Sequence, residues 1–223
     1  MPRRIFRTRD ELERIARERF GYGGLRPAQR EVIELVLAGH DTMAVMPTGS
    51  GKSAIYQIAA LLKAGPTVVI SPLLALQQDQ LESIQDRPLP DAAAVNSSVP
   101  ASARREALEN VEQGELEYLF LGPEQLARSE TREQVLKSGP SLFVVDEAHC
   151  VSEWGHDFRP DYLRLKPILE ALGHPTVLAL TATASEHVRQ DIVAGIGMWN
   201  PKIVVTGFDR PNISVFERSR TLG

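Results

Sequence analysis

The stretch Met46-Pro-Thr-Gly-Ser-Gly-Lys-Ser53 carries most of the information about this chain. It follows a short apolar run at residues 43–46, which predicts a buried strand, and an apolar run at 54–62 predicts a helix after it. A glycine-rich loop between a strand and a helix turns its backbone N–H groups toward an anion, and the helix dipole strengthens the attraction. Lys52 can reach the β- and γ-phosphates, and the Ser53 hydroxyl can bind Mg²⁺. We therefore expect this loop, in which Met46 replaces the usual first glycine, to bind a nucleoside triphosphate.

A second strand end strengthens this interpretation. The apolar run at 142–145 is followed directly by Asp146 and Glu147. Asp146 is placed to hold Mg²⁺, commonly through water, and Glu147 to orient and deprotonate an attacking water molecule. Two acids here could also be a plain helix N-terminus, where negative charge is favourable. Together with the upstream loop, they predict Mg²⁺-dependent hydrolysis of the triphosphate, with Lys52, Asp146 and Glu147 as the residues that carry the chemistry.

Composition sets the outer limits. The chain has 223 residues, which is enough for one large α/β domain with a substantial core. The only cysteine, Cys150, excludes an intramolecular disulfide and a cysteine-based zinc site. No apolar stretch is long enough for a membrane span, and the Arg-rich N-terminus has no apolar signal core, so we expect a cytoplasmic protein, nucleoid-associated in a bacterium. The formal charge of −4 argues against a uniformly basic nucleic-acid binder but allows a local basic groove.

Apolar strand patterns alternate with helical patterns along most of the chain, which is typical of a parallel sheet covered on both faces. We therefore predict an α/β fold with a single large domain. A capping box at 8–11 predicts a first helix to about residue 19, and Pro27 a second over 27–38. The other predicted helices are 53–64, 73–84, 101–113, 129–137, 161–171 and 185–195, and the predicted strands are 42–46, 67–71, 92–95, 117–121, 141–145, 176–180 and 202–206.

Polar residues directly follow several of the predicted strands. In an open parallel sheet, ligands bind beyond the carboxyl ends of the strands, so these residues should lie along one rim. Each could be a turn that the topology requires, but their number favours a shared functional surface. The segments are the glycine loop, Ser71-Pro72, Gly122-Pro-Glu124, Asp146-Glu147 and Thr181-Ala-Thr183.

The order of these segments resembles the first motor lobe of a superfamily-2 helicase, a RecA-like fold, and further details resemble the RecQ family. The resemblance covers roughly residues 18–216. Its most specific part is the aromatic-rich loop that begins after Asp146-Glu-Ala-His149 and runs Cys150-Val-Ser-Glu-Trp-Gly-His-Asp-Phe-Arg-Pro-Asp-Tyr162. The others are Phe20-Gly-Tyr22 with Arg26-Pro-Ala-Gln29, the loop at 46–53, and Phe208-Asp-Arg-Pro-Asn212, which matches the end of that lobe.

The resemblance implies an adenine-reading segment near the N-terminus. A glutamine amide can both donate to and accept from the adenine edge, so Gln29 would select ATP over GTP. Tyr22 would stack on the base and Arg26 would approach the nucleotide, although both could simply pack at the start of the helix. With ATP and Mg²⁺ as cofactors, the expected nucleotide-binding residues are Tyr22, Arg26, Gln29, Thr48, Gly49, Ser50, Gly51, Lys52 and Ser53, and Ser53 and Asp146 hold the metal.

The aromatic-rich loop is expected to couple DNA binding to ATP hydrolysis. Aromatic faces and a guanidinium are groups on which single-stranded nucleic acid stacks, although aromatic side chains in a loop can also anchor it to the core. Single-stranded or partly duplex DNA is the expected partner. Its expected contacts are Ser71, Pro72, Gln80, Trp154, His156, Phe158 and Arg159. Gln78 departs from the family pattern, in which a lysine is common, and puts one such contact in doubt.

Three further residues are expected to transmit the state of the nucleotide. The resemblance makes His149 a link between the triphosphate site and the other motor lobe, so we group it with the catalytic residues; it could also be a core histidine. Thr181 and Thr183 match the family's coupling motif. Alternatively, they only cap the helix that begins near Ser185.

The resemblance also implies a second RecA-like lobe, which would supply an arginine finger and close the ATP site. We expect a helical segment at 1–19, the first lobe at 20–216 and the start of a linker at 217–223, and we expect the lobe alone to bind nucleotide but hydrolyse it poorly. The predicted function is ATP-dependent DNA unwinding with 3′ to 5′ translocation. The alternatives are an RNA-remodelling helicase lobe, a free-standing nucleotide- or DNA-binding module and, last, a small-molecule kinase.

Overall fold

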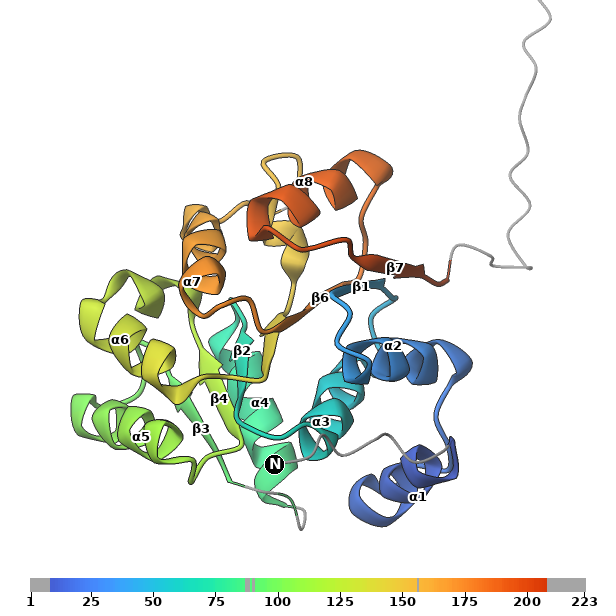
Figure 1. Ribbon diagram of the computed structural model, residues 1–223, viewed down its shortest axis with the longest axis horizontal. Coiled ribbons are helices and arrows are strands. Elements are labelled where there is room, and N and C mark those ends of the chain that lie inside the picture. Colours follow the sequence, from blue (N-terminus) through green and yellow to red (C-terminus); the bar gives the residue numbers. More distant parts are fainter. Residues whose placement is uncertain (1–8, 87–88, 90, 156, 208–223) are drawn as a thin grey trace, which may run out of the picture.

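The computed structural model describes residues 9–86, 89, 91–155 and 157–207, and every structural statement below refers to these residues. Seven strands form one parallel sheet in the order β3-β4-β2-β5-β6-β1-β7 (Figure 1). The α/β fold is therefore confirmed. The strands are β1 (Thr42–Val45), β2 (Thr67–Ile70), β3 (Ala92–Val95), β4 (Tyr118–Leu121), β5 (Leu142–Val145), β6 (Thr176–Thr181) and β7 (Lys202–Val205).

Helices cover both faces of the sheet, which explains why the central strands are continuous apolar runs. The first four helices pack on one face through a core that contains Val32, Ile55 and Leu81. The last four pack on the other face around Leu108 and Ile192. The helices are α1 (Arg9–Phe20), α2 (Pro27–Leu37), α3 (Lys52–Leu62), α4 (Leu74–Gln85), α5 (Ala101–Gln113), α6 (Ser129–Ser138), α7 (Leu165–Ala171) and α8 (Glu186–Ile196).

All seven predicted strands are present within one residue at each end, and most helices match equally well. One helix prediction is wrong in its first half. Residues 161–171 were expected to form one helix, but the segment begins as a 3₁₀ helix, η3 (Pro160–Arg164), and α7 starts only at Leu165. Pro167 explains the difference. Its ring would clash with the carbonyl of the residue four positions earlier in an established α-helix, whereas it fits within the first turn of a helix that begins at Leu165.

The strand register aligns the carboxyl ends that matter for function. Val45 pairs with Thr181, and Ile70 pairs with both Leu121 and Val145. The residues that follow β1, β2, β4, β5 and β6 therefore lie along one rim, as predicted from their position after each strand. Two further short 3₁₀ helices, η1 (Pro123–Ala127) and η2 (Ala148–Val151), follow β4 and β5 on this rim. Within the described ranges, no helix combines the length and the apolar character needed to cross a bilayer.

The opposite rim of the sheet, at the amino ends of the strands, holds a partly buried acid. Glu117 directly precedes β4, and its Oε1 is buried without a hydrogen-bond partner among the described residues. Burial raises the pKa of its carboxyl from 4.5 to about 7. The folded protein therefore keeps this proton up to about pH 7, whereas the unfolded chain releases it near pH 4.5. The free energy of unfolding must fall as the pH rises through this window, and the full penalty is present above pH 7.

We therefore expect Glu117→Gln to stabilise the protein at pH 8.5 by about 1–2 kcal/mol, after allowance for the partial exposure of the group. At pH 4.5 the same substitution should change stability little, because the carboxyl is protonated in the folded state. Urea unfolding at the two pH values measures both quantities. Glu115→Gln, which removes an exposed carboxylate two residues earlier, is the matched control. Equal effects of Glu117→Gln at both pH values would contradict the buried-acid explanation.

Candidate nucleotide and nucleic-acid site

The phosphate loop connects the end of β1 to the first residue of α3. Gly49 and Gly51 adopt φ angles of 75° and 80°, in the left-handed region that favours glycine. Gly51 is also the residue before Lys52, and any side chain on it would collide with the amide of Gln29. The sequence therefore places glycine where both the backbone angle and the space require it.

The loop fits an anion. The Ser50 hydroxyl is buried without a hydrogen-bond partner among the described residues, and a Cβ on Gly49 would meet nothing within 4 Å. Lys52 Nζ donates to the Met46 carbonyl oxygen at 3.2 Å, so its ammonium group folds back over the loop. The N-terminus of α3 begins at the same residue and adds its partial positive charge. An unpaired hydroxyl, open space and positive potential coincide here, as a phosphate site requires.

Asp146 lies beside this loop at the end of β5. Its side chain is only 7% exposed, and its Oδ1 accepts a hydrogen bond from the Glu147 backbone N–H at 3.0 Å. Burial and the neighbouring Glu147 charge raise the pKa of Asp146 to about 6, although Lys52 and His149 oppose the shift. A nearby cation would stabilise a carboxylate in this environment, so Asp146 is suited to hold Mg²⁺. The half-buried Ser53, in the first turn of α3, is the other residue expected to hold it.

Glu147, His149 and Thr181 form a hydrogen-bonded chain. His149 Nδ1 lies 3.2 Å from Glu147 Oε2 and 3.1 Å from Thr181 Oγ1. The Thr181 hydroxyl donates its own proton to the Thr183 carbonyl oxygen at 3.1 Å. Thr181 Oγ1 must therefore accept from His149, so Nδ1 carries a proton. The chain links the carboxylate predicted to be catalytic, directly after β5, to the coupling segment predicted at the end of β6.

The charges in this chain favour an ionised Glu147. Its hydrogen bond with His149 lowers the pKa of the Glu147 carboxyl. In turn, contacts with Cys150 and with Glu147 raise the pKa of His149 to about 10. Glu147 also has φ of 47°, an uncommon angle for a residue other than glycine. The strained backbone holds this carboxylate at the point where β5 ends and η2 begins.

The sequence matches the family model of DEAD/DEAH box helicases over residues 26–192. This match spans well over half of the chain and includes the phosphate loop, Asp146, Glu147 and Thr181. The chain belongs to the DEAD/DEAH box helicase family. The helicase domain thus contains, in a single fold, the segments that the sequence analysis singled out.

Two curated relatives indicate which helicases within this family the chain resembles in sequence. The helicase domain is 41% identical to the probable ATP-dependent DNA helicase RecS of Bacillus subtilis, over 92% of this chain and 41% of that protein. It is 39% identical to the ATP-dependent DNA helicase RecQ of Pasteurella multocida, over 87% of this chain and 30% of that protein. The chain thus spans less than half the length of these curated relatives, and it is homologous to DNA helicases of the RecQ and RecS type.

Solved structures agree on the fold. A hypothetical ATP-dependent RNA helicase from Sulfolobus tokodaii superposes with a TM-score of 0.68 at 22% identity, over 89% of this chain and 57% of that one. The DUF1998 helicase MrfA, solved bound to DNA, superposes with a TM-score of 0.70 at 17% identity, over 92% of this chain and 30% of that one. At such identities the likeness concerns the fold alone.

The predicted adenine segment lies against the phosphate loop of the helicase domain. Gln29 is buried, and its Nε2 donates to the carbonyl oxygens of Ser50 at 3.0 Å and Gly51 at 3.2 Å. Its Oε1 accepts from the Arg26 backbone N–H at 2.9 Å. Tyr22 stacks on Phe20 with ring centroids 5.7 Å apart, and the Arg26 side chain is exposed. Gln29 therefore connects the start of α2 to the loop.

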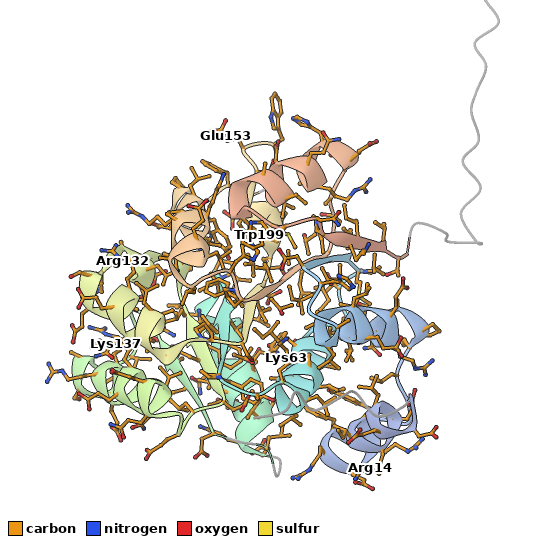
Figure 2. All side chains as sticks on the ribbon, in the orientation of Figure 1. Arg14, Lys63, Arg132, Lys137, Glu153 and Trp199 are labelled. Carbon is orange, nitrogen blue, oxygen red and sulfur yellow. The ribbon has the colours of Figure 1, made fainter. Side chains whose placement is uncertain are left out.

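The aromatic-rich loop meets the Ser71-Pro72 segment. Arg159 Nη1 donates to the Pro72 carbonyl oxygen at 3.1 Å, and its Nε and Nη2 bind the Asp157 carboxylate. Phe158 is half-buried, whereas Trp154 is 75% exposed. The loop carries its indole into solvent. Figure 2 shows the adjacent Glu153 at the outer surface beside α8.

Of the residues predicted to contact nucleic acid, Gln80 is hydrogen-bonded within the domain and His156 lies outside the described residues. Gln80 is half-buried on α4, and its Oε1 accepts from Tyr56 Oη at 3.1 Å and from Gln57 Nε2 at 3.0 Å. These bonds tie α4 to α3, so the amide oxygen of Gln80 has a structural use within this domain. His156 lies outside the described residues, as does the segment 208–212 that was matched to the end of the lobe.

Two residues to which the sequence analysis assigned no role, Tyr162 and Gly155, contact the main chain of the segment that follows β5. The fully buried Tyr162 donates its hydroxyl proton to the Asp146 carbonyl oxygen at 3.2 Å. Tyr162 is the last residue of the aromatic-rich loop, so the sequence placed it near the site but did not indicate its hydrogen-bond partner. Any side chain on Gly155 would collide with the His149 carbonyl, so the aromatic-rich loop rests directly on the segment that follows β5. No sequence pattern marks these contacts.

Proposed function

We propose that this helicase domain is the first motor lobe of a RecQ-like ATP-dependent DNA helicase. One observation supports the proposal most directly. The hydrogen-bonded chain from Glu147 through His149 to Thr181 and Thr183 adjoins the loop that exposes Trp154, because Gly155 of the loop packs on the His149 carbonyl. A base that stacks on this loop can therefore act on the residues that surround the triphosphate. The identity to RecS and RecQ helicases provides independent support.

The nucleotide half of the proposal assigns a role to each group on the rim. Backbone N–H groups of residues 48–53 and the ammonium of Lys52 bind the β- and γ-phosphates of ATP. Ser53 and Asp146 hold Mg²⁺, which neutralises charge on the phosphate oxygens. Glu147, ionised because of His149, accepts a hydrogen bond from the attacking water and orients it toward the γ-phosphate.

Adenine recognition is assigned to Gln29, with Tyr22 and Arg26 beside it. The amide of Gln29 already binds the backbone of the phosphate loop, so an adenine edge would have to share or replace these hydrogen bonds. Binding of the base would therefore change the hydrogen bonds to the carbonyl oxygens of Ser50 and Gly51. Guanine presents the opposite donor and acceptor pattern to the same amide, which supports a preference for ATP.

The nucleic-acid half of the proposal assigns single-stranded DNA to the surface that the aromatic-rich loop shares with Pro72, next to which Ser71 is buried. Trp154, Phe158 and Arg159 would contact bases, and the Ser71-Pro72 segment would contact the backbone, which fixes position without reading sequence. Gln80 and His156 complete the proposed set. A second motor lobe would contribute an arginine finger, and repeated closing and opening of the two lobes would move the protein 3′ to 5′ along the strand.

We expect single-stranded DNA to stimulate ATP hydrolysis in a protein that contains this domain and a second lobe. Trp154→Ala should reduce the stimulation by about tenfold or more, because stacking on an aromatic face contributes about 1–3 kcal/mol per base. The ATPase rate measured against the concentration of oligodeoxythymidylate tests this. Trp199→Ala is the matched control, since Trp199 is 66% exposed but lies just before β7 on the opposite rim.

The same assay separates the alternatives. Equal stimulation by single-stranded RNA and DNA would favour an RNA-remodelling lobe. Hydrolysis that ignores nucleic acid in both the wild type and the Trp154→Ala variant would contradict the DNA-driven motor and leave only the nucleotide site. The hypothetical RNA helicase of Sulfolobus tokodaii shares the fold, but an identity of 22% does not favour RNA.

A further inference from the structure

Helix α8 holds the base of the aromatic-rich loop from the side. Ser152 is 1% exposed, and its hydroxyl donates to Asp191 Oδ2 at 2.7 Å. The same hydroxyl oxygen accepts the backbone N–H of Trp154 at 3.2 Å. A single buried hydroxyl therefore connects a carboxylate on α8 to the main chain of the residue that carries the exposed indole. Short hydrogen bonds to an ionised group are stronger than those between neutral groups.

The same helix also contacts the indole ring. His187 lies one turn before Asp191, and its imidazole meets the Trp154 ring edge-on with centroids 5.9 Å apart. His187 Nε2 is 3.9 Å from Asp191 Oδ2. Farther along α8, a Cβ on Gly195 would collide with Val151, so the helix and the loop are closely packed. Backbone, ring and base of the loop are thus all fixed by one face of α8.

The position of α8 in the chain makes this support relevant to coupling. Ser185, two residues after the Thr181 to Thr183 segment, is the N-cap of the helix, and its hydroxyl accepts from the Val188 backbone N–H. Thr181 contacts His149 beside the catalytic carboxylate. The two segments expected to report nucleotide and DNA are therefore joined by a rigid helix as well as through His149.

We propose that Asp191 is a positioning residue for DNA-stimulated ATP hydrolysis, which holds Trp154 in place through the Ser152 hydroxyl. This inference rests on the proposed function, because it assigns a support to the loop that senses DNA. Asp191 does not touch DNA or nucleotide. It limits the conformations of the loop before DNA arrives, so that less entropy is lost when a base stacks on the indole.

The first test measures ATP hydrolysis in the two-lobed protein as the concentration of oligodeoxythymidylate is varied. Asp191→Ala should raise the DNA concentration for half-maximal stimulation by about tenfold, the effect of losing one hydrogen bond to a charged group. The KM for ATP should not follow this change. Asp191→Asn keeps an oxygen that can accept from Ser152 but lacks the charge, and should recover part of the loss. Glu186→Ala, which removes a carboxylate from the exposed first turn of α8, is the matched control.

A double-mutant cycle locates the effect in the Ser152 contact. Ser152→Ala alone should resemble Asp191→Ala, and the double variant should be little worse than either single variant. An unchanged half-saturating DNA concentration in Asp191→Ala would overturn the proposal. Additive effects of the two substitutions would overturn it as well, and so would an equal rise in the KM for ATP, which indicates a general loss of structure.

Fluorescence separates this inference from the proposed function. The chain has two tryptophans, Trp154 and Trp199, and Trp199 stacks on His174. In a Trp199→Phe variant of this domain, Trp154 is the only tryptophan that contributes to the fluorescence. Asp191→Ala should then lower the anisotropy of Trp154 emission, whatever the ATPase assay shows. Absence of DNA stimulation in the wild type would refute the proposed function, whereas unchanged anisotropy would refute the positioning role of Asp191.

Discussion

Lys52→Ala is expected to weaken ATP binding by about 100- to 1,000-fold. Lys52 supplies the only side-chain ammonium of the phosphate loop, and charge-assisted hydrogen bonds to two phosphates are worth about 1.5–3 kcal/mol each. Alanine keeps the helical start of α3, because it is the best helix former. The loss should therefore concern the nucleotide and not the fold.

Calorimetric titration of ATP in the presence of Mg²⁺, with and without the substitution, measures this effect. Lys137→Ala removes the same charge from an exposed position on α6 and should leave the affinity unchanged. A second titration with AMP provides a check, because the substitution should reduce ATP binding much more than binding of a nucleotide without β- and γ-phosphates. Unchanged ATP affinity in Lys52→Ala would remove the phosphate assignment for residues 46–53.

Glu147→Gln is expected to keep ATP binding but to lower turnover in the two-lobed protein by about 10²- to 10⁴-fold, the usual contribution of a general base. Glutamine has the size of glutamate and can still accept one hydrogen bond from His149. It lacks the negative charge of the carboxylate, which the His149 contact keeps ionised in the native protein by lowering its pKa. Water would then bind near the γ-phosphate without a partner able to take its proton.

Steady-state turnover at saturating ATP and DNA, together with the ATP affinity, separates the two roles. The affinity for ATP should change by less than about threefold, since no phosphate contact is lost. Glu153→Gln, a change of the same kind in the exposed part of the aromatic-rich loop, is the matched control. Normal turnover in Glu147→Gln would exclude Glu147 as the general base and leave Asp146 as the only carboxylate of the pair with a proposed role in hydrolysis.

Much of the fold could be predicted because its signals are local. Each strand is a short apolar run bounded by glycine, proline or polar residues, and parallel pairing then needs only the alternation of strands and helices. The one helix that was predicted wrongly, over 161–171, also had a local cause, because Pro167 fixes the start of α7 at Leu165. Strand order, by contrast, was not predicted from the sequence.

The segments of the proposed nucleotide site could also be located from the sequence, because their residues lie close together in the chain. Glycines at 49 and 51, Lys52 and Ser53 belong to one loop, and Asp146 and Glu147 follow one strand. Their positions on a common rim followed from the rule that parallel strands present their carboxyl ends together. The register of β1, β5 and β6 confirms that expectation.

Sequence by itself therefore determined which residues belong to the phosphate loop, the carboxylate pair and the aromatic-rich loop. Only the tertiary structure decided how these segments are joined: Gln29 to the loop backbone, Arg159 to Pro72, and Ser152 to Asp191. The physical reason is distance along the chain. These contacts join residues 21 to 87 positions apart, and no periodicity or local motif encodes which side chains meet when separate elements pack on a shared sheet.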